Sequence, residues 1–356
     1  MTLPNHADHQ MSAFANKIIH WQQREGRHGL PWQGVRDPYR VWLSEIMLQQ
    51  TQVATAIPYF ERFIARFPDF NALAAAADDD VMKLWAGLGY YARARNLHLA
   101  AKMVVEKHRG KFPEGFEEIL ALPGIGRSTA AAISAFAFGE RRAILDGNVK
   151  RVFARQFGVE GDVRTKLVEN VLWEIAEKKL PMVAIETYTQ GLMDLGATVC
   201  TRTNPLCLLC PVQKTCVAFK EGRIDSLPGK GARRETPHRQ TRMLVIVSGG
   251  KILLEKRPPT GIWGGLWCLP ELPLEQDMFA ILHKRYGMKG RTVRELERVE
   301  HGFTHYSLSI FPVEIAVTKI ESRAMEPGCM WINPEDAIDA AIPAPVKRIL
   351  SARGNQ

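Results

Sequence analysis

The sequence predicts two domains, a mainly α-helical one followed by a smaller α+β one. Three observations predict this division. Apolar residues recur at helical spacing through most of residues 1–228, and few runs there alternate with a period of two. Residues 229–241 are polar and basic, which indicates an interdomain linker. Strand-like runs separated by turn residues then follow in residues 242–356.

Composition bounds the class of protein. A chain of 356 residues can bury large cores, and 46% apolar with 24% charged residues is typical of globular proteins. A net charge of +9 permits a polyanionic partner without requiring one. No apolar run approaches the roughly twenty residues that span a bilayer, and the first thirty residues lack a signal-peptide core. We therefore expect a soluble, cytoplasmic protein without membrane contact.

The predicted elements follow from periodicity and turn residues. Pro and Gly mark short loops between the helices of the first domain. Helical spacing covers residues 11–22, 41–57, 58–67, 81–86, 92–108, 128–138, 149–157, 166–177 and 186–195. In the second domain, strands are predicted at residues 243–247, 251–256 and 308–317, and helices at residues 277–286 and 334–339. The second domain is therefore α+β.

A glycine turn, Leu122-Pro123-Gly124-Ile125-Gly126, separates two helical stretches. Glycine permits the positive φ at which successive backbone N–H groups converge on one point. Such a concave row of amides suits a phosphate oxygen. A simple helix–helix connection has the same pattern, so the turn gains meaning from the residues around it.

Glu45 is the carboxylate of an apolar helical stretch, residues 41–53. A Glu held among apolar side chains resists ionisation and could act as a general acid. A surface Glu on an amphipathic helix is the alternative. Gln49, Gln50 and Gln52 follow at once, and these long neutral amides are suited to reading or replacing a base. These glutamines favour the interpretation of Glu45 as a general acid over that of a surface residue.

Asp146 offers a complementary carboxylate. It precedes the helical segment of residues 149–157 and would lie near the positive end of that helix, which favours the anion. A pure helix cap is the alternative. One neutral and one charged carboxylate form the pair that protonates a leaving group while stabilising an oxocarbenium ion. The two residues together predict cleavage of a glycosidic bond.

Four of the six cysteines lie within seventeen residues, in the pattern C-x6-C-x2-C-x5-C. Compact loops of this kind hold zinc or an iron–sulfur cluster. Paired C-x-x-C knuckles are typical of zinc, whereas the single close pair and unequal spacing here favour a cubane cluster. With Arg202, Lys214 and Lys220 on or near the loop, the cluster would be a scaffold that presents cations to phosphates. The ligands would be Cys200, Cys207, Cys210 and Cys216.

Long strings of this sequence resemble the helix-hairpin-helix DNA glycosylases and, among them, the MutY family of adenine glycosylases, which remove adenine mispaired with 8-oxoguanine. The resemblance runs nearly end to end. It implies a helix-hairpin-helix catalytic domain with a [4Fe-4S] cluster loop, followed by a Nudix-like domain. The strings that carry it are residues 42–53, 87–96, 122–130 and 145–152 and the four-cysteine loop.

The resemblance also implies roles for single residues. Glu45 would protonate the flipped adenine, at N7, and later help water to add, while Asp146 would stabilise the sugar cation. Tyr90 and Asn148 would support the active site. Ser128 stands where bifunctional relatives carry a lysine nucleophile, which implies a monofunctional enzyme. The residues implied to contact DNA or a base are Trp32, Gln33, Gln49, Gln50, Thr51, Leu88, Gly124, Gly126, Ser128 and Gln190.

The C-terminal part resembles the MutT-like, Nudix-type domain of the same family through residues 257–267. No R-E-x-x-E-E cluster follows, and such carboxylates are what would hold magnesium on a diphosphate, so we expect no hydrolase activity there. Phe303-Thr304-His305 resembles the family's Phe-Ser-His reader of 8-oxoguanine, with Thr in place of Ser. On its own, His305 would be taken for an ordinary loop residue.

The implied partner is double-stranded DNA that contains 8-oxoguanine opposite adenine or, less specifically, guanine opposite adenine. We expect a monomer, and contacts with a replication clamp or a mismatch-repair protein stay open. Two other hypotheses compete. The first is a glycosylase for mispaired thymine or a pyrimidine lesion on the same fold. The second is a noncatalytic mismatch-binding protein, for which the amide turn, the net charge and the base-reading domain would suffice.

Overall fold

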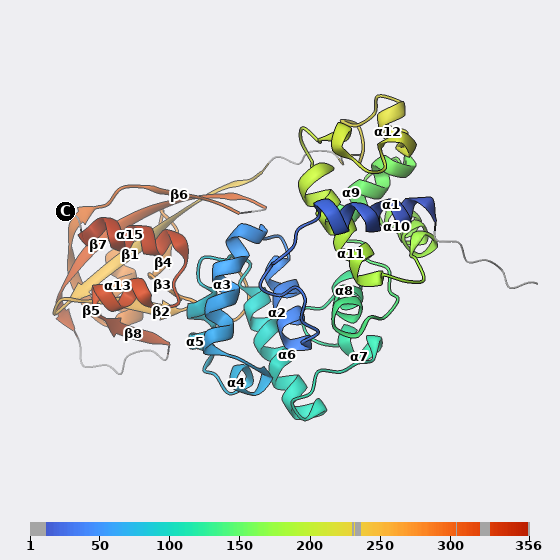
Figure 1. The fold of residues 1–356 in the computed structure, drawn as a ribbon. Coiled ribbons are helices and arrows are strands. Elements are labelled where there is room, and N and C mark those ends of the chain that lie inside the picture. Colours follow the sequence, from blue (N-terminus) through green and yellow to red (C-terminus); the bar gives the residue numbers. More distant parts are fainter. Residues whose placement is uncertain (1–11, 230, 232–235, 304, 321–327, 355–356) are drawn as a thin grey trace, which may run out of the picture. The chain divides into compact units, whose positions relative to one another are not determined.

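The computed structural model describes residues 12–229, 231, 236–303, 305–320 and 328–354. The chain forms two compact units (Figure 1). The first comprises residues 1–74 and 99–233, and the second comprises residues 75–98 and 234–356. No helix in the described ranges is long and apolar enough to cross a membrane.

The first unit is helical, as the sequence predicts. The helices are α1 (Ala13–Glu25), α2 (Pro38–Leu48), α3 (Val53–Arg66), α4 (Phe70–Ala74), α7 (Phe116–Leu120), α8 (Arg127–Phe138), α9 (Gly147–Phe157), α10 (Lys166–Lys179), α11 (Ile185–Asp194) and α12 (Val217–Lys220). One apolar core of this unit is formed by buried side chains of α1, α8, α9, α10 and α11. Shorter turns are η1 (Leu195–Val199), which is π-helical, η2 (Cys207–Leu209) and η3 (Gln213–Thr215), while α6 (Ala92–His108) extends through both units.

One predicted helix is interrupted. Periodicity predicts a continuous helix over residues 41–57, but α2 ends at Leu48 and α3 begins at Val53. The break occurs because Gln50 adopts a left-handed conformation with φ of 58°, which no α-helix accommodates. The glutamines that follow Glu45, Gln49, Gln50 and Gln52, therefore lie in the turn between α2 and α3.

The glycine turn joins α7 to α8. The amide of Ile125 donates to the carbonyl of Leu122 at 3.2 Å, and Gly124 has φ of +82°. Gly126 is the N-cap of α8 with φ of −96°, an extended conformation open to any residue. A positive φ is expected at both glycines of the turn, Gly124 and Gly126. Only Gly124 has one. The hairpin itself has the predicted order of helix, tight turn and helix.

The second unit contains a mixed sheet and accompanying helices. The main path of the sheet runs β3-β2-β1-β7-β5, and β4, β6 and β8 pair at its sides. The strands are β1 (His238–Ser248), β2 (Lys251–Lys256), β3 (Trp267–Cys268), β4 (Glu271–Leu272), β5 (Met288–Glu295), β6 (Val299–Gly302), β7 (Ser307–Ile320) and β8 (Cys329–Ile332). The helices are α5 (Asp78–Trp85), α13 (Met278–Tyr286), α14 (Pro334–Asp339) and α15 (Ala344–Gly354).

Strand β1 begins earlier than periodicity indicates. It pairs in parallel with β7 from His238 opposite Ser307 to Val247 opposite Ala316. The first strand residues are polar and exposed, so the apolar pattern used to find strands starts only at Met243. Backbone pairing with β7 extends the strand through a polar segment, which is why the sequence places a linker there.

Candidate active site

A cavity of about 550 Å³ in the first unit brings together four residues that the sequence singles out. Glu45 comes from α2 and Gln190 from α11, while Trp32 and Gln33 come from the loop that precedes α2. The mixture of aromatic, amide and carboxylate groups in one concave site is typical of a pocket for a small planar ligand.

Glu45 is a carboxyl whose surroundings favour the neutral form. It lines the cavity from a helix whose neighbouring side chains, Ser44 and Ile46, are buried. Burial, followed by the negative charge of Asp146, raises the pKa of Glu45 from 4.5 to about 8. The carboxyl is therefore protonated at neutral pH and has a proton to donate.

Asp146 is the N-cap of α9. Its Oδ1 accepts a hydrogen bond from the amide of Val149 at 2.7 Å. Burial is the largest influence and raises the pKa of Asp146 above 3.8, whereas the amides of Val149 and Asn148 and the cations Arg151 and Lys150 lower it. The sequence predicts the stabilising helix end but not the depth of burial, which reverses the net direction of the shift.

Asn148 follows Asp146 in the first turn of α9 and is held by Arg151. One guanidinium nitrogen of Arg151 donates to Asn148 Oδ1 at 2.7 Å and to the carbonyl of Gly196 at 2.6 Å. Arg151 Nε also donates to the carbonyl of Cys200 at 2.7 Å. The turn that carries Asp146 is therefore tied to the segment that enters the cysteine loop.

Three glutamines line the cavity, Gln22, Gln33 and Gln190, and the last two have different hydrogen-bond partners. Gln33 donates through Nε2 to the carbonyl of Arg27 at 3.1 Å and accepts through Oε1 from the amide of Leu30 at 3.1 Å. Gln190 donates through Nε2 to Asp194 at 2.8 Å. Gln33 thus stabilises its own loop, whereas Gln190 is oriented by a carboxylate one helical turn away.

The turn after α2 connects to the glycine hairpin. Gln49 Nε2 lies 3.4 Å from both the carbonyl of Gly124 and Thr129 Oγ1. Gln50 is exposed in its left-handed conformation, and the amide of Thr51 donates to the carbonyl of Leu48 at 3.2 Å. The residues implied to enter the base stack therefore lie beside the residues implied to hold the backbone. Their contacts with DNA stay predictions.

Ser128 has a structural contact that the sequence does not reveal. Its hydroxyl oxygen accepts a hydrogen bond from the amide of Leu145 at 2.9 Å. Leu145 is buried and directly precedes Asp146. Ser128 therefore anchors the backbone that leads to Asp146.

Leu88 and Tyr90 belong to the second unit. Leu88 is buried, whereas Tyr90 is 48% exposed and has φ of 50°. Arg93 donates to the carbonyls of Leu88 and Gly89 at 3.2 Å, and its guanidinium lies 5.5 Å from the Tyr90 ring centroid. This arginine fixes the loop that carries both predicted site residues.

The cysteine loop contains four free thiols. Burial first, and then the charges of neighbouring sulfurs, raise the pKa of Cys207, Cys210 and Cys216, in the case of Cys210 to about 12. Over the described part of the chain, no three His, Cys, Asp or Glu side chains are arranged to hold one metal ion. The four sulfurs supply the donor type of an iron–sulfur cluster or a zinc site, but the described conformation does not bring three of them around one point.

Arg155 holds the cysteine loop to α9. Its guanidinium donates to the carbonyl of Thr201 at 2.7 Å and of Leu227 at 2.8 Å, and lies 3.5 Å from Cys200 Sγ. Arg155 is 3% exposed. A buried cation beside the sulfurs would stabilise thiolates, which supports the fit of this loop to a thiolate-ligated group.

The predicted 8-oxoguanine reader lies in the turn between β6 and β7. The amide of Phe303 donates to the carbonyl of Tyr306 at 2.8 Å, and the two rings stack with centroids 4.6 Å apart. Trp263 and His301 also contact the Phe303 ring. His305 is exposed, and Thr304 lies outside the described residues.

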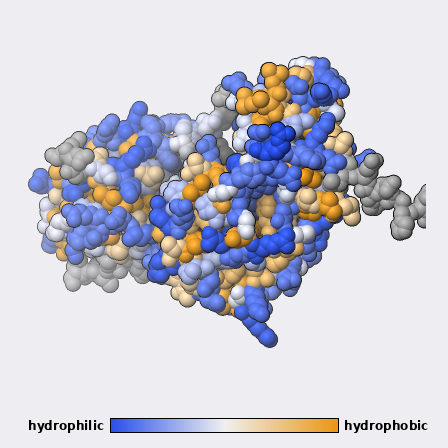
Figure 2. All heavy atoms as spheres, in the orientation of Figure 1, coloured by the Kyte–Doolittle hydropathy of each residue, from blue (hydrophilic) through white to orange (hydrophobic). Residues whose placement is uncertain are grey.

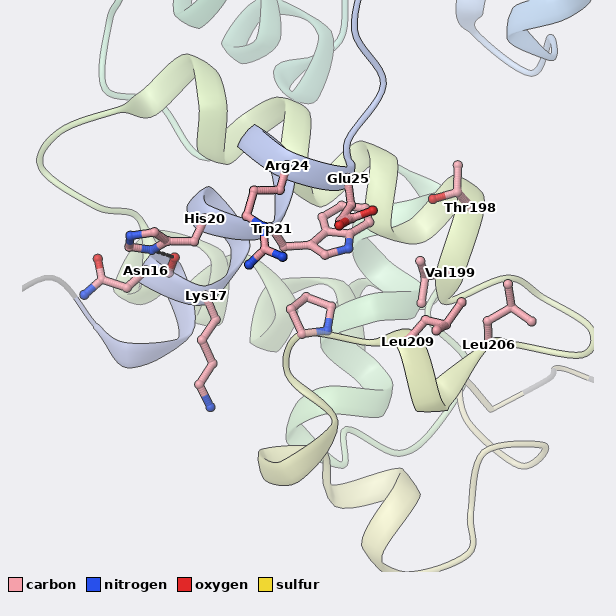
Figure 3. Close-up of a pocket in the computed structure, with 11 residues that line it drawn as sticks. Asn16, Lys17, His20, Trp21, Arg24, Glu25, Thr198, Val199, Leu206 and Leu209 are labelled. Carbon is pink, nitrogen blue, oxygen red and sulfur yellow. Dashed lines mark hydrogen bonds between the residues drawn. The ribbon is translucent and has the colours of Figure 1, made fainter.

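A second cavity of about 780 Å³ lies between α1 and the cysteine loop and contains none of the residues predicted to act on a base (Figure 3). Lys17, His20 and Arg24 line it from α1, opposite Leu206 and Leu209. Figure 2 shows hydrophobic side chains at the surface of the lobe that carries α12. Lacking a pair of facing carboxylates, this cavity is not a candidate for glycosidic chemistry.

Sequence reasoning misses three residues whose hydrogen bonds position predicted site residues. They are Arg27, Arg151 and Asp194. Asp194 is completely buried and pairs with Arg27 at 2.7 Å. The signal for Asp194 was present, because it ends an apolar helix between Met193 and Leu195, where an isolated carboxylate needs a partner.

Comparisons with known proteins identify the family to which the chain belongs. Residues 43–178 match the HhH-GPD superfamily of base excision DNA repair proteins, and residues 242–352 match the NUDIX domain. An adenine DNA glycosylase of Buchnera aphidicola is 37% identical over 95% of this chain and 96% of its own length. The chain belongs to the adenine DNA glycosylase family. The human and mouse adenine DNA glycosylases are each 32% identical, over 96% and 95% of this chain and 74% and 77% of their own lengths.

Solved structures extend the comparison to the fold. A thermostable thymine-DNA glycosylase is 30% identical, with a TM-score of 0.54 over 58% of this chain and 95% of its own. An endonuclease III bound to DNA is 21% identical, with a TM-score of 0.51 over 59% and 94% of the two chains. The helical fold of this adenine DNA glycosylase family member is therefore that of the wider superfamily of base excision enzymes.

Proposed function

We propose that this chain hydrolyses the N-glycosidic bond of adenine mispaired with 8-oxoguanine, or with guanine, in duplex DNA. One observation carries the proposal. A carboxyl with a pKa of about 8, Glu45, lines a cavity of about 550 Å³, and Asp146 is close enough to influence its ionisation. The cavity suits a base that has been extruded from the duplex, as an enzyme acting on a paired base requires.

In this mechanism Glu45 and Asp146 have different catalytic roles. Glu45 donates its proton to N7 of the bound adenine, which weakens the bond from N9 to the sugar as the base becomes a neutral leaving group. Asp146 stabilises the oxocarbenium charge that develops on the sugar. Glu45, now ionised, accepts a proton from the water that adds to the sugar. Asn148 and Arg151 keep the turn of Asp146 in place.

Ser128 supports a monofunctional reaction. A bifunctional glycosylase needs an amine that forms a covalent bond to the sugar, and the Ser128 hydroxyl instead accepts the amide of Leu145. Release of adenine without efficient strand cleavage is the expected outcome.

We further propose that Cys200, Cys207, Cys210 and Cys216 ligate a [4Fe-4S] cluster. When bound, the cluster would supply structural order and charge rather than an oxidation step. Four thiols in one loop and the buried Arg155 support the assignment. In the second unit, we propose that the Phe303–His305 turn, which includes Thr304, reads 8-oxoguanine.

The test is release of the free base from defined duplexes under single-turnover conditions. Duplexes would pair 8-oxoguanine with adenine, guanine with adenine, and guanine with thymine. Free adenine, released fastest opposite 8-oxoguanine, is expected. Release of thymine would favour a thymine glycosylase, and tight binding without any release would favour a mismatch-binding protein.

A further inference from the structure

The cavity between α1 and the cysteine loop has two walls of different chemistry (Figure 3). Lys17, His20 and Arg24 line it from α1 and form a basic stripe. These positions are three and four residues apart, so their side chains lie along one face of the helix. The apolar wall consists of Val199, Leu206, Leu209 and Pro211. A basic stripe and an apolar wall therefore border the same space of about 780 Å³.

The apolar wall is only partly covered by the protein's own side chains. Leu206 is 51% exposed and Leu209 is 66% exposed. The amide of Leu206 donates to the carbonyl of Val199 at 2.9 Å, and the amide of Leu209 donates to the carbonyl of Leu206 at 3.0 Å. These backbone hydrogen bonds hold both leucines in an ordered turn at the surface. Apolar surface of this kind, bordered by polar residues, is typical of a site that a partner covers.

The basic stripe has positive charge to offer. Within the described ranges, no ion pair or hydrogen bond of the Lys17 or Arg24 side chain is recorded. The Nδ1 atom of His20 donates to the carbonyl of Asn16 at 2.8 Å, which holds the imidazole against α1. Glu25 is the carboxylate among the residues that line the cavity, so the balance of charge there is positive. An acidic partner is therefore complementary to this wall.

The spacing of the stripe indicates the form of the partner. Lys17 and Arg24 are seven residues apart, which is about 10 Å along an α-helix. A second helix that carries carboxylates seven residues apart has the same spacing, and helices that bind in grooves place apolar anchors at matching intervals. DNA phosphates match the charge but leave the leucines uncovered. A second copy of this chain, with its net charge of +9, brings like charge to the stripe.

We propose that this cavity binds an acidic amphipathic helix of a partner protein. The carboxylates of that helix pair with Lys17 and Arg24, and its apolar side chains cover Leu206 and Leu209. All four residues belong to the first unit, and none of them is assigned to adenine excision. The cavity is therefore a docking surface separate from the reaction, and the inference does not depend on the proposed function.

The test uses a synthetic, fluorescein-labelled helical peptide as the probe. It has about sixteen residues in an alanine-rich sequence, a length that supports helical structure in water. Two Glu side chains lie seven residues apart, and Leu side chains occupy the adjoining face. Fluorescence anisotropy with the full-length protein at low ionic strength should show saturable binding.

Two control peptides separate the contributions of charge and apolar contact. One has Gln in place of each Glu, and the other has Ala in place of each Leu. Each should bind about tenfold more weakly than the acidic peptide, because each lacks one of the two contributions. The absence of saturable binding by the acidic peptide, or equal binding by all three peptides, overturns the inference.

Arg24→Glu tests the basic stripe, and Lys107→Glu is its matched control. Both residues lie in the last turn of a helix, α1 and α6, so both charge reversals oppose the helix dipole in the same way. Arg24→Glu should weaken binding of the acidic peptide by about tenfold, whereas Lys107→Glu, outside the cavity, should not. Equal weakening by both variants indicates attraction to net charge alone and overturns the inference. If Arg24→Glu does not fold, as judged by circular dichroism, Lys17→Gln replaces it.

Leu206→Gln tests the apolar wall, and Leu208→Gln is its matched control. Both residues adjoin Cys207, but only Leu206 lines the cavity, whereas Leu208 is 85% exposed. Leu206→Gln should weaken binding of the acidic peptide by about tenfold, and Leu208→Gln should leave it unchanged. The iron content of each variant shows whether the proposed cluster is retained. Unchanged peptide binding by Leu206→Gln overturns the inference.

Other occupants of the cavity give different results. The expected outcome for Arg24→Glu is a monomer whose affinity for a duplex with 8-oxoguanine opposite adenine equals that of the parent protein. Weaker duplex binding with unchanged peptide binding would assign the cavity to DNA. A dimer of the parent protein in sedimentation velocity that Arg24→Glu dissociates would assign it to a second copy. Either result overturns the inference.

Discussion

Glu45 and Asp146 are two carboxyl groups of the same unit with different surroundings. Glu45 is near the end of an apolar helix, and both recorded influences on it, burial and the charge of Asp146, raise its pKa. Asp146 starts a helix, where amide hydrogen bonds and two cations oppose the effect of burial. The difference teaches that burial raises the pKa of both carboxyl groups, whereas only Asp146 has amide and cationic partners that offset part of this rise.

Removing the proton of Glu45 should have the largest effect on the reaction. Glu45→Gln keeps the shape and hydrogen-bonding capacity but cannot donate a proton to N7, so single-turnover adenine release is expected to fall by about 10²–10⁴-fold, the contribution of general acid catalysis. Duplex binding, measured by fluorescence anisotropy, should be retained. An unaltered release rate would falsify the assigned acid.

Neutralising Asp146 should have the next largest effect. Asp146→Asn keeps an acceptor for the amide of Val149 but removes the negative charge beside the sugar, so adenine release is expected to fall by about 10²–10³-fold. The helix cap survives in this variant, and the melting temperature should change little. Loss of stability with a normal rate per folded molecule would instead assign Asp146 to capping alone.

The pH dependence follows from the raised pKa of Glu45. The neutral acid is present below pH 8 and declines above it, so the rate of adenine release should fall about tenfold for each pH unit above about 8. Glu45→Gln should lack this limb. A rate that is flat from pH 7 to pH 10 in the parent protein would contradict Glu45 as the titrating acid.

The free energy of unfolding should also depend on the ionisation of Glu45, and it should decrease as the pH rises. Because folding raises the pKa of Glu45 from 4.5 to about 8, its contribution is complete below pH 4.5 and is lost as the pH rises to about 8. Relative to the parent protein, Glu45→Gln should gain unfolding free energy over this window. Urea unfolding at several pH values measures the gain, and Glu25→Gln, at an exposed position of α1, should show none.

Sequence alone predicts the helical half, the glycine hairpin and the pairing of Glu45 with Asp146, because helical periodicity, turn residues and carboxylates are local signals. Sequence alone does not predict features that depend on contacts between residues distant in the chain. The helix break at Gln50 depends on a backbone conformation that glutamine seldom adopts, and the polar start of β1 depends on pairing with β7. The resemblance implies a pocket with Trp32, Gln33 and Gln190, but the orientation of each amide depends on Arg27 and Asp194.

The smallest expected effect concerns the support of Asp146. Ser128→Ala removes the acceptor for the amide of Leu145 and leaves that buried donor without its recorded partner, so the unfolding free energy should fall by about 1–3 kcal/mol. The matched control is Ser134→Ala on the same helix, where a buried hydroxyl has no recorded partner within the described residues and its loss should be close to neutral.

The activity of Ser128→Ala tests whether the Ser128 hydroxyl supports Asp146 or acts on Glu45. The substitution loosens the backbone before Asp146 without touching α2, so adenine release should slow by a few-fold while the pH at which activity declines stays near 8. A rate profile across pH measures both quantities. If the declining limb moved while the rate at pH 7 stayed constant, the hydroxyl would act on the proton of Glu45 rather than on the position of Asp146.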